Sequence, residues 1–419
     1  MKEAVLDFVY SLDLEEKLSP RKNVEIIWFY IFFPFFIAYL WILTTYINLK
    51  PNIGSIEVLD PEFSRLLYPK YNMEVIATGM SWAEGPLWIN DENAGIGYLM
   101  FSDPITNRIY KWEDGKGMFT VGKTIYSENG GCIQDKEYCD SFFMPGANGL
   151  IRKDSTSLDL IVCQHGERAV TLFRENGTRS AIATHFKGKR LNSPNDVVFS
   201  PDGHLYFTDP PFGLYNKNKS TLIGQELPLS GIYFIARDFL QNAISIGNAT
   251  EGIILLDKSM TRPNGLAFSP DYSKLYVSNC DVNDPIIKVF DVSSNGALLN
   301  SKVFYNMSEL YHQETLIANS EANECQTAHD DASTSCPIRK AGCPDGLKVD
   351  IHGNVFATGP GGVLVFNQDG KLIGRFRLNK EASNIAFGED GRIYITAEDL
   401  LIRLWIKTKP ARIIKSNRK

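Results

Sequence analysis

Apolar and polar residues alternate in short paired runs through most of the chain after residue 73. In the clearest case, DVVFSPDGHLYFTDP (196–210), two such runs flank a Pro-Asp-Gly turn, which is the pattern of a β-hairpin. Imperfect copies begin at residues 85, 149, 265, 346 and 384, and most are followed by a third strand-like run. Repeats at this spacing are typical of propeller blades. We therefore expect an all-β, six-bladed β-propeller over residues 73–410, in which MEVIATG (73–79) adds a strand to the last blade.

A different pattern precedes the repeats. Residues 26–47 form an uncharged apolar run of 22 residues, long enough to cross a bilayer as one helix. The run is longer than the 7–15 apolar residues typical of a signal peptide, and no small-residue cleavage site follows it. The sequence therefore predicts a cytosolic tail at 1–25, a transmembrane helix at 26–47 and a linker at 48–72. A buried helix of a globular domain is the alternative.

The features on either side of this run predict its orientation. Four basic residues precede it, and only Lys50 and Arg65 follow it closely, which favours a cytosolic N-terminus. All the N-x-S/T sequons follow the run, as do all seven cysteines. We expect a single-pass membrane glycoprotein whose propeller lies in the secretory-pathway lumen or outside the cell. The sequons are at Asn176, Asn218, Asn248 and Asn306.

The cysteines fall into two loop-like stretches and two strand-like ones. One or two disulfides are expected from the loop-like stretches, unless these cysteines are free thiols. Cys163 lies inside a strand pattern, and we expect it to be free. The loop-like stretches contain Cys132 and Cys139, and Cys325, Cys336 and Cys343.

Aligning the repeats places one residue of each blade just before its first strand. In a propeller the first strands line the central channel, so these six positions should converge on one face. Most are carboxylates or carboxamides, whose oxygens suit a hard cation such as Ca²⁺ or Mg²⁺. Alternatively, these residues are there only because Asn, Asp and Ser favour turns, although Glu is a weak turn former. The six residues are Glu84, Asn148, Asn195, Asn264, Asp345 and Ser383.

Composition and motifs narrow the chemistry. The net charge of −6 gives no electrostatic footprint for nucleic acid. The six histidines include no HExxH or other paired spacing, and no CxxC, G-x-S-x-G or G-x-G-x-x-G pattern is present in a suitable context. A bound divalent cation with one carboxylate base would suffice to hydrolyse a lactone. Asp345 is the candidate base. His165 is a second proton acceptor or a hydrogen-bond donor to substrate, with a structural role as the alternative. Asp103 and Asp209 are interpreted as groups that orient the ligand amides, or as turn caps.

Four segments of the repeats have a distinctive spelling, namely SWAEGPLW (81–88), LNSPNDVVFSPDGHLYFTDPPFG (191–213), RPNGLAFSPD (262–271) and CPDGLKVD (343–350). Together they resemble the senescence-marker-protein/gluconolactonase/luciferin-regenerating-enzyme family, and the resemblance extends over residues 75–405. It implies that Glu84, Asn195, Asn264 and Asp345 hold one divalent metal. The apolar run and a polar insertion at about 311–342 depart from the family pattern.

The sequence thus predicts a metal-dependent lactone hydrolase with Asp345 as general base. Calcium is the expected metal, with Mg²⁺, Zn²⁺ or Mn²⁺ as alternatives. Two other functions stay open. One is a strictosidine-synthase/paraoxonase-like ester hydrolase, and the other is a non-catalytic surface propeller that a metal stabilises. The candidate substrate contacts are Asn148, His165, Asn195 and Asp209.

Overall fold

The hairpins of the sequence form the inner strands of antiparallel sheets. The strand β14 (Leu205–Asp209) shows why, because all five of its residues are buried. Its apolar residues pack on both faces of the sheet, and its polar end carries Asp209. The computed structural model of the chain describes residues 53–69, 72–91, 96–114, 123–155, 157–246, 252–328 and 340–411. These residues belong to one compact unit that begins at Ile53.

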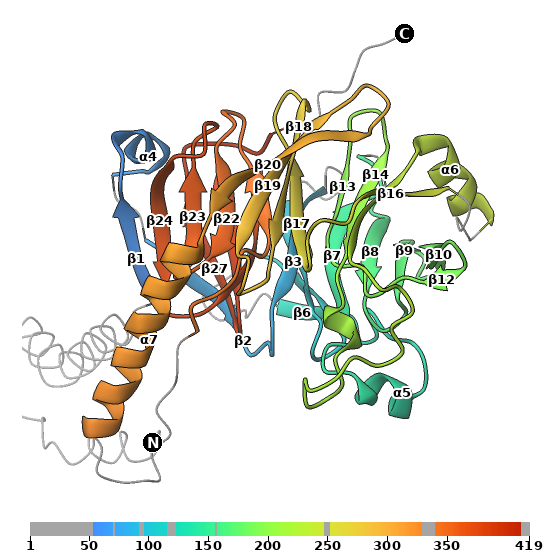
Figure 1. Ribbon diagram of the computed structural model, residues 1–419, viewed down its shortest axis with the longest axis horizontal. Helices are drawn as coiled ribbons and strands as arrows, with labels where there is room; N and C mark the ends of the chain where they lie inside the picture. Colours follow the sequence, from blue (N-terminus) through green and yellow to red (C-terminus); the bar gives the residue numbers. More distant parts are fainter. Residues whose placement is uncertain are drawn as a thin grey trace, which may run out of the picture. The chain divides into compact units, whose positions relative to one another are not determined.

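Six blades make up the described part, which confirms the predicted β-propeller (Figure 1). The first three blades are β3 (Glu84–Asp91), β4 (Ile96–Asp103), β5 (Arg108–Trp112) and β6 (Lys123–Ser127); β7 (Ala147–Arg152), β8 (Leu160–Gln164), β9 (Ala169–Phe173) and β10 (Arg179–Ala183); and β13 (Val197–Phe199), β14, β15 (Gly231–Ile235) and β16 (Ile253–Asp257). The last three are β17 (Pro263–Phe268), β18 (Lys274–Asn279), β19 (Ile286–Val292) and β20 (Leu298–Asn306); β21 (Leu347–Val349), β22 (Val355–Gly359), β23 (Gly362–Phe366) and β24 (Leu372–Leu378); and β25 (Ala382–Phe387), β26 (Arg392–Ala397), β27 (Leu400–Trp405) and β2 (Glu74–Thr78).

Shorter elements decorate this ring. The two-stranded ribbon β11–β12 follows the second blade, and the helices lie on the outside and the edges of the sheets (Figure 1). These elements are β1 (Gly54–Val58), α4 (Pro61–Leu66), α5 (Lys136–Ser141), β11 (His185–Phe186), β12 (Lys189–Arg190), a 3₁₀ helix (Phe212–Leu214), α6 (Arg237–Ile246) and α7 (Ser308–Ala328).

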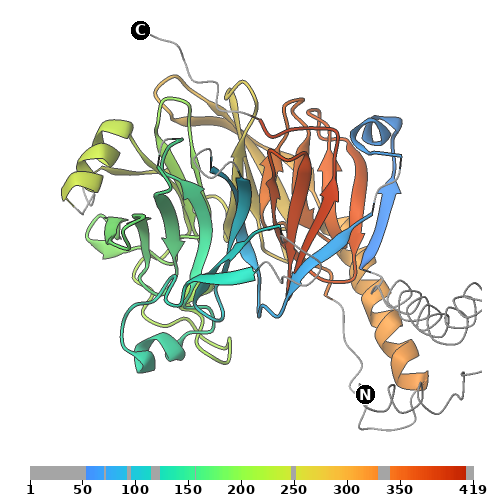
Figure 2. The same cartoon turned by 180° about the vertical axis from the view of Figure 1, so that it is seen from behind.

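Strands from the two ends of the propeller close the ring. β2 pairs antiparallel with β27, with Val75 opposite Ile402, so the predicted closure by MEVIATG is confirmed. β1 adds a fifth strand to the fifth blade by pairing with β24, and α4 packs Phe63 on Phe376 with ring centroids 5.3 Å apart. Figure 2 shows these blue N-terminal strands beside the red C-terminal ones. β1 and α4 fall in the stretch that the sequence analysis assigned to a linker.

Aromatic contacts between blades hold the sheets around the channel. Trp88 of the first blade stacks on Tyr394 of the sixth at 5.2 Å, and Tyr206 of the third meets Phe268 of the fourth edge-on at 5.1 Å. Such pairs stabilise by about 0.5–1.5 kcal/mol beyond the area they bury. The blades therefore hold the starts of the inner strands in fixed relation to one another.

The predicted membrane segment lies outside the described residues. No helix among those described is long and apolar enough to cross a bilayer. Of the sequons, Asn176, Asn218 and Asn306 are exposed, and Asn248 lies outside the described residues.

Two disulfides are present in the described part. Cys132 pairs with Cys139 inside one of the loop-like stretches, whereas Cys343 pairs with Cys280, which lay outside those stretches; this second bond links the end of β18 to the segment before β21. Cys163 is buried and free, as predicted.

Candidate metal and active site

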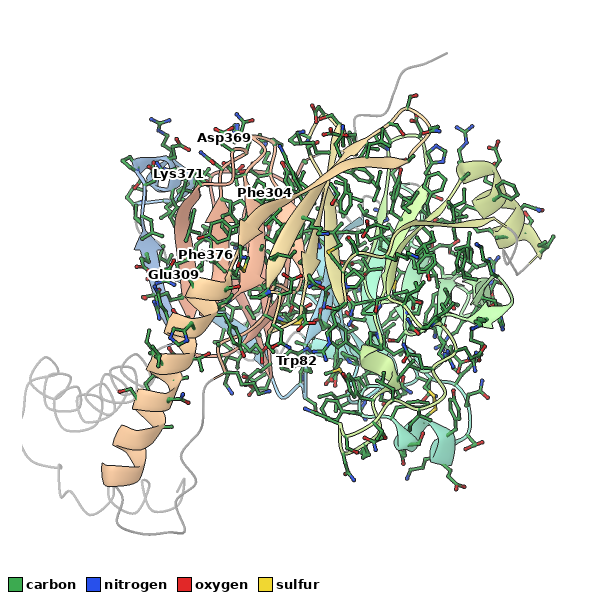
Figure 3. All side chains as sticks on the ribbon, viewed as in Figure 1. Trp82, Phe304, Glu309, Asp369, Lys371 and Phe376 are labelled. Carbon is green, nitrogen blue, oxygen red and sulfur yellow. A yellow bond between two sulfur atoms is a disulfide. The ribbon has the colours of Figure 1, made fainter. Side chains whose placement is uncertain are left out.

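The starts of four first strands surround a cavity of about 560 Å³ at one mouth of the channel. Its lining includes the predicted residues Glu84, Asn148, Asn264 and Asp345. The cavity also contains Trp82, which Figure 3 labels on the side of the propeller where α5 and α7 lie. The sequence alignment of the blades therefore identified a real convergence of polar residues.

The two other aligned positions do not line this cavity. Asn195 is 2% exposed, and its main chain bonds the strands beside it, with its carbonyl accepting from Gly149 N at 2.7 Å. Ser383 is fully buried, and its hydroxyl donates to the carbonyl of Ala83 at 2.5 Å, which joins the sixth blade to the first. Ser383 is thus a structural bridge. Asn195, which the sequence suggests both as a metal ligand and as a substrate contact, stays a prediction in both roles.

Asp345 has a carboxylate oxygen with no partner. Its Oδ1 is buried without a hydrogen bond to the described residues, and the side chain of Asn264 bonds the carboxyl group. Burial, reinforced by the nearby charge of Glu84, raises the pKa of Asp345 well above its usual value. A cation placed here would satisfy the free oxygen and offset the cost of burying the charge.

Glu84 is held by the turn that follows it. Its Oε2 accepts from Gly85 N at 3.0 Å and from Asn384 Nδ2 at 3.4 Å. Burial, with the charge of Asp196, raises the pKa of Glu84 to about 7. Gly85 has φ +49°, and a Cβ there would lie 2.1 Å from the carbonyl oxygen of Asn148, so the close approach of the two blades requires glycine.

Beneath the aligned ring lies a second polar layer that the sequence analysis missed. Four blades have glycine directly after the aligned residue, whereas the third and sixth have Asp196 and Asn384. Lys348 Nζ donates to Asn384 Oδ1 at 3.3 Å and lies 4.0 Å from Asp196 Oδ2, which has no hydrogen bond. The two non-glycine residues in the repeat alignment were the signal for this layer.

His165 lies behind Asn148 and outside the cavity lining. Its Nδ1 is 3.2 Å from the carbonyl oxygen of Met144, and its Nε2 is 3.5 Å from Asn148 Nδ2. A carbonyl only accepts, so Nδ1 carries the proton and Nε2 accepts from the amide. Burial lowers the pKa of His165 to about 4. His165 therefore orients Asn148, and the expectation that it accepts a proton from water or contacts substrate is not supported by its position.

Asp209 was predicted to contact substrate, but the structure places it elsewhere. It is fully buried, is absent from the cavity lining, and accepts from the backbone of Asn192 at 2.8 Å. Asp103 likewise accepts from Ser81 N at 2.8 Å and Trp82 N at 3.2 Å. Both carboxylates thus cap the backbone of the segments that lead to the aligned residues, as the turn-cap interpretation expects.

The rim of the cavity combines aromatic rings with lysines. Lys219 Nζ lies 3.8 Å from the centre of the Phe143 ring, and Lys340 Nζ lies 5.6 Å from that of Trp82. Lys340 also pairs with Glu381 at 3.7 Å. The sequence analysis missed these groups, because they lie in loops outside the repeated strands.

Cys280 and Cys343 also line the cavity, close to Asp345. Their sulfur atoms and a carboxylate oxygen of Asp345 lie within 4.8 Å of one another. Both sulfurs belong to the disulfide, so they offer no thiolate to a metal. The donors that remain are carboxylate and amide oxygens.

Comparison with known proteins identifies the family. The profile of the SMP-30/Gluconolactonase/LRE-like region matches residues 82–399. The chain belongs to this family. A family member, the gluconolactonase of Zymomonas mobilis subsp. mobilis, is 33% identical over 361 residues, which cover 85% of this chain and 87% of that protein.

Solved structures of the family share the fold. The gluconolactonase of Xanthomonas campestris matches with a TM-score of 0.62 and 25% identity, covering 84% of this chain and 96% of that one. A luciferin-regenerating enzyme matches with a TM-score of 0.54 and 16% identity, covering 81% and 97%. The predicted resemblance is therefore confirmed.

Proposed function

We propose that this protein hydrolyses a lactone at the cavity formed by Glu84, Asn148, Asn264 and Asp345. The observation that carries the proposal is the buried, unpartnered Oδ1 of Asp345 at that cavity. The gluconolactonase relative, which is matched over most of both chains, supports the choice of reaction.

The residues present fit a divalent cation. Glu84, Asn264 and Asp345 offer oxygen donors at the cavity, and Asn195 is the fourth predicted ligand. Hard oxygen donors favour Ca²⁺, with Mg²⁺, Mn²⁺ and Zn²⁺ as alternatives. When bound, such a cation supplies a Lewis acid that polarises the lactone carbonyl and stabilises the oxyanion.

Asp345 and Asn148 then divide the remaining tasks. Asp345 takes the proton of the attacking water, and its burial raises its pKa in the direction that a general base requires. Asn148, oriented by His165 Nε2, presents its amide at the cavity wall as a hydrogen-bonding group for the substrate. Trp82 and Phe143 at the rim cover the lactone and exclude water.

A substrate panel tests the reaction. Glucono-1,5-lactone, an aryl ester and a phosphotriester are offered to the purified protein with each of the four metals and with chelator. We expect lactone hydrolysis that depends on metal and exceeds the other two activities. Faster aryl-ester turnover would favour the paraoxonase-like function. No turnover with any substrate or metal would leave the metal-stabilised, non-catalytic propeller.

We further propose that the propeller lies across a membrane from the N-terminus. The three exposed sequons and the two disulfides support an oxidising compartment. In intact microsomes the propeller should be protected from protease and sensitive to glycosidase. Complete digestion of the propeller there would contradict this topology.

A further inference from the structure

A second cavity adjoins the metal-site cavity and has a volume of about 370 Å³. The two share walls formed by Phe212, Lys340, Glu381 and the Cys280–Cys343 disulfide. Each volume is within the range of small-molecule sites. The two cavities therefore lie next to each other, with these shared residues between them.

Helix α7 forms one wall of this second cavity. Tyr311, Thr315, Ala318 and Asn319 line it from the helix, which includes much of the insertion noted in the sequence. The helix is fixed by Glu314, whose 1% exposed side chain reaches Arg377 at 2.9 Å and Arg375 at 3.2 Å on β24. The second cavity therefore has a firmly anchored wall.

Unpaired positive charge lies at this cavity. Arg262 lines it, donates from Nη2 to the hydroxyl of Tyr215 at 3.0 Å, and lies 6.0 Å from the centre of the Phe212 ring. The ion pairs of the described residues do not include Arg262, although Asp281 is close enough for its pKa to be lowered by the guanidinium charge. A guanidinium whose remaining donors have no anion is suited to bind a carboxylate or phosphate bidentately.

The other cations of the two cavities differ in how far they are compensated. Lys380 pairs with Glu398 at 3.2 Å and Asp399 at 3.0 Å, and Lys340 pairs with Glu381 at 3.7 Å. Lys219, like Arg262, has no carboxylate within ion-pair distance among the described residues; its Nζ lies over the Phe143 ring, and Glu381 is close enough to act on its charge. Among these cations, Arg262 and Lys219 are therefore the ones whose charge no ion pair of the described residues compensates.

We propose that the second cavity is a subsite for an anionic group, a carboxylate or a phosphate, that the lactone carries away from its ring, with Arg262 as the group that binds it. This assignment rests on the proposed lactone hydrolysis. It makes the preferred substrate an acidic sugar lactone, and it assigns the α7 insertion to substrate selection.

Three lactones with the same ring test the assignment. They are glucono-1,5-lactone, which is neutral, 6-phosphoglucono-1,5-lactone and glucaro-1,5-lactone, and kcat/KM is measured for each with the full protein at saturating Ca²⁺. We expect at least one acidic lactone to exceed the neutral one by tenfold or more, and the better of the two identifies the anion. Arg262→Gln should lower kcat/KM for that lactone by about 10- to 100-fold, the range for losing a hydrogen bond to a charged group, and change the neutral lactone less than threefold.

Two variants serve as controls. Arg262→Lys keeps the positive charge but not the two parallel N–H donors of the guanidinium. Its kcat/KM for the acidic lactone should fall between those of wild type and Arg262→Gln. Lys189→Gln removes an exposed cation of β12 and should change none of the three rates. Good hydrolysis of the neutral lactone with no preference for an acidic one would overturn the subsite and leave the lactonase proposal intact.

A binding measurement does not need turnover. Calorimetry compares gluconate, which has one carboxylate, with glucarate and 6-phosphogluconate, which carry a second anionic group. At least one of the latter two should bind more tightly than gluconate, and Arg262→Gln should remove this difference. Equal binding of all three by the wild type, or an unchanged difference in Arg262→Gln, would overturn the assignment even if no lactone were hydrolysed.

Discussion

The hydroxyl of Ser278 donates a hydrogen bond to the main-chain carbonyl of Asp345. The end of the second strand in the fourth blade thereby holds the carboxylate-bearing turn of the fifth. Ser102 makes the same bond to the carbonyl of Asn148 at 2.7 Å, and Thr208 to that of Asn264 at 2.8 Å. In these three blades the hydroxyl one residue before the end of the second strand therefore links its blade to the next aligned residue.

This linkage predicts different effects for two similar serines. Ser278→Ala and Ser102→Ala each remove a buried hydroxyl, and each should lower the free energy of unfolding by about 1 kcal/mol. Only Ser278→Ala frees the turn of a predicted metal ligand, so only this variant should weaken metal binding. Denaturant unfolding and metal titration measure the two quantities. Equal losses of metal affinity in both variants would show that the hydroxyls act only on global stability.

The repeat explains how much of this arrangement could be read from the sequence. The blades and the aligned residues recur with the hairpin, so Glu84 and Asp345 were placed correctly. The hydroxyl linkage recurs as well, but it appears in the sequence only as Ser or Thr in a strand, which ordinary β-propensity also explains. In the second blade the equivalent residue is Cys163, a weak donor, which obscures the pattern further.

Non-repeated contacts could not be predicted in this way. The position of His165 beside a second-strand end suggested contact with substrate, but Met144 and Asn148 occupy both ring nitrogens. Lys219 and Arg262 approach the site through loop geometry that no periodicity encodes. Cys280 and Cys343 are 63 residues apart in the sequence, and they pair because the fourth and fifth blades bring them together in space.

Metal removal should destabilise the propeller. A cation that binds only the folded state stabilises it by about 2.7 kcal/mol at a hundredfold excess over Kd. Chelator should therefore lower the Tm of the wild type, and Glu84→Gln should remove most of this response. Calorimetric melting with and without Ca²⁺ checks the expectation. The same melting curve in both conditions would mean that the aligned residues are turn formers without a metal.

His165 should make the protein less stable in mild acid. Its folded-state pKa of about 4 lies below the ordinary 6.5, so the unfolded state binds a proton first as the pH falls. Its contribution is fully present above pH 6.5 and is lost toward pH 4, at up to about 1.4 kcal/mol per pH unit. Buried acids such as Glu84 act in the opposite direction, so the measured quantity is the difference between wild type and His165→Gln.

The control for this experiment is His185→Gln, on the small ribbon β11–β12. The free energy of unfolding is measured from pH 7 to pH 4 for all three proteins. As the pH falls, wild type and His185→Gln should lose equal amounts of unfolding free energy, and both should lose more than His165→Gln. Parallel curves of stability against pH for wild type and His165→Gln would show that His165 is protonated in the folded state with its ordinary pKa.

The two disulfides should differ in their effect on the site. Cys280–Cys343 closes a loop of 63 residues, and its loss should cost about 4 kcal/mol in the chain-entropy account, against about 2 kcal/mol for the 7-residue loop of Cys132–Cys139. Because Cys343 lies two residues before Asp345, only the Cys280→Ser/Cys343→Ser variant should also weaken metal binding. Unfolding and metal titration of both paired-serine variants test this. Gly265 N also donates to the Asp345 carbonyl, at 3.2 Å, so unchanged metal affinity in that variant would show that Ser278 and Gly265 suffice to hold the turn.

The last prediction separates proton transfer from metal binding. Asp345→Asn keeps an oxygen donor of the same size but removes the base and one negative charge. Metal affinity should fall modestly, while lactone hydrolysis at saturating metal should fall by roughly 10²–10⁴, the usual range for losing a general base. Asn264→Ala removes an oxygen donor and the amide that bonds Asp345 but leaves the base in place, so it should weaken metal binding and regain part of its activity as the metal concentration rises. Metal titrations of kcat for both variants distinguish the two patterns. Near wild-type turnover by Asp345→Asn at saturating metal would mean that Asp345 only binds the metal and that another group accepts the proton.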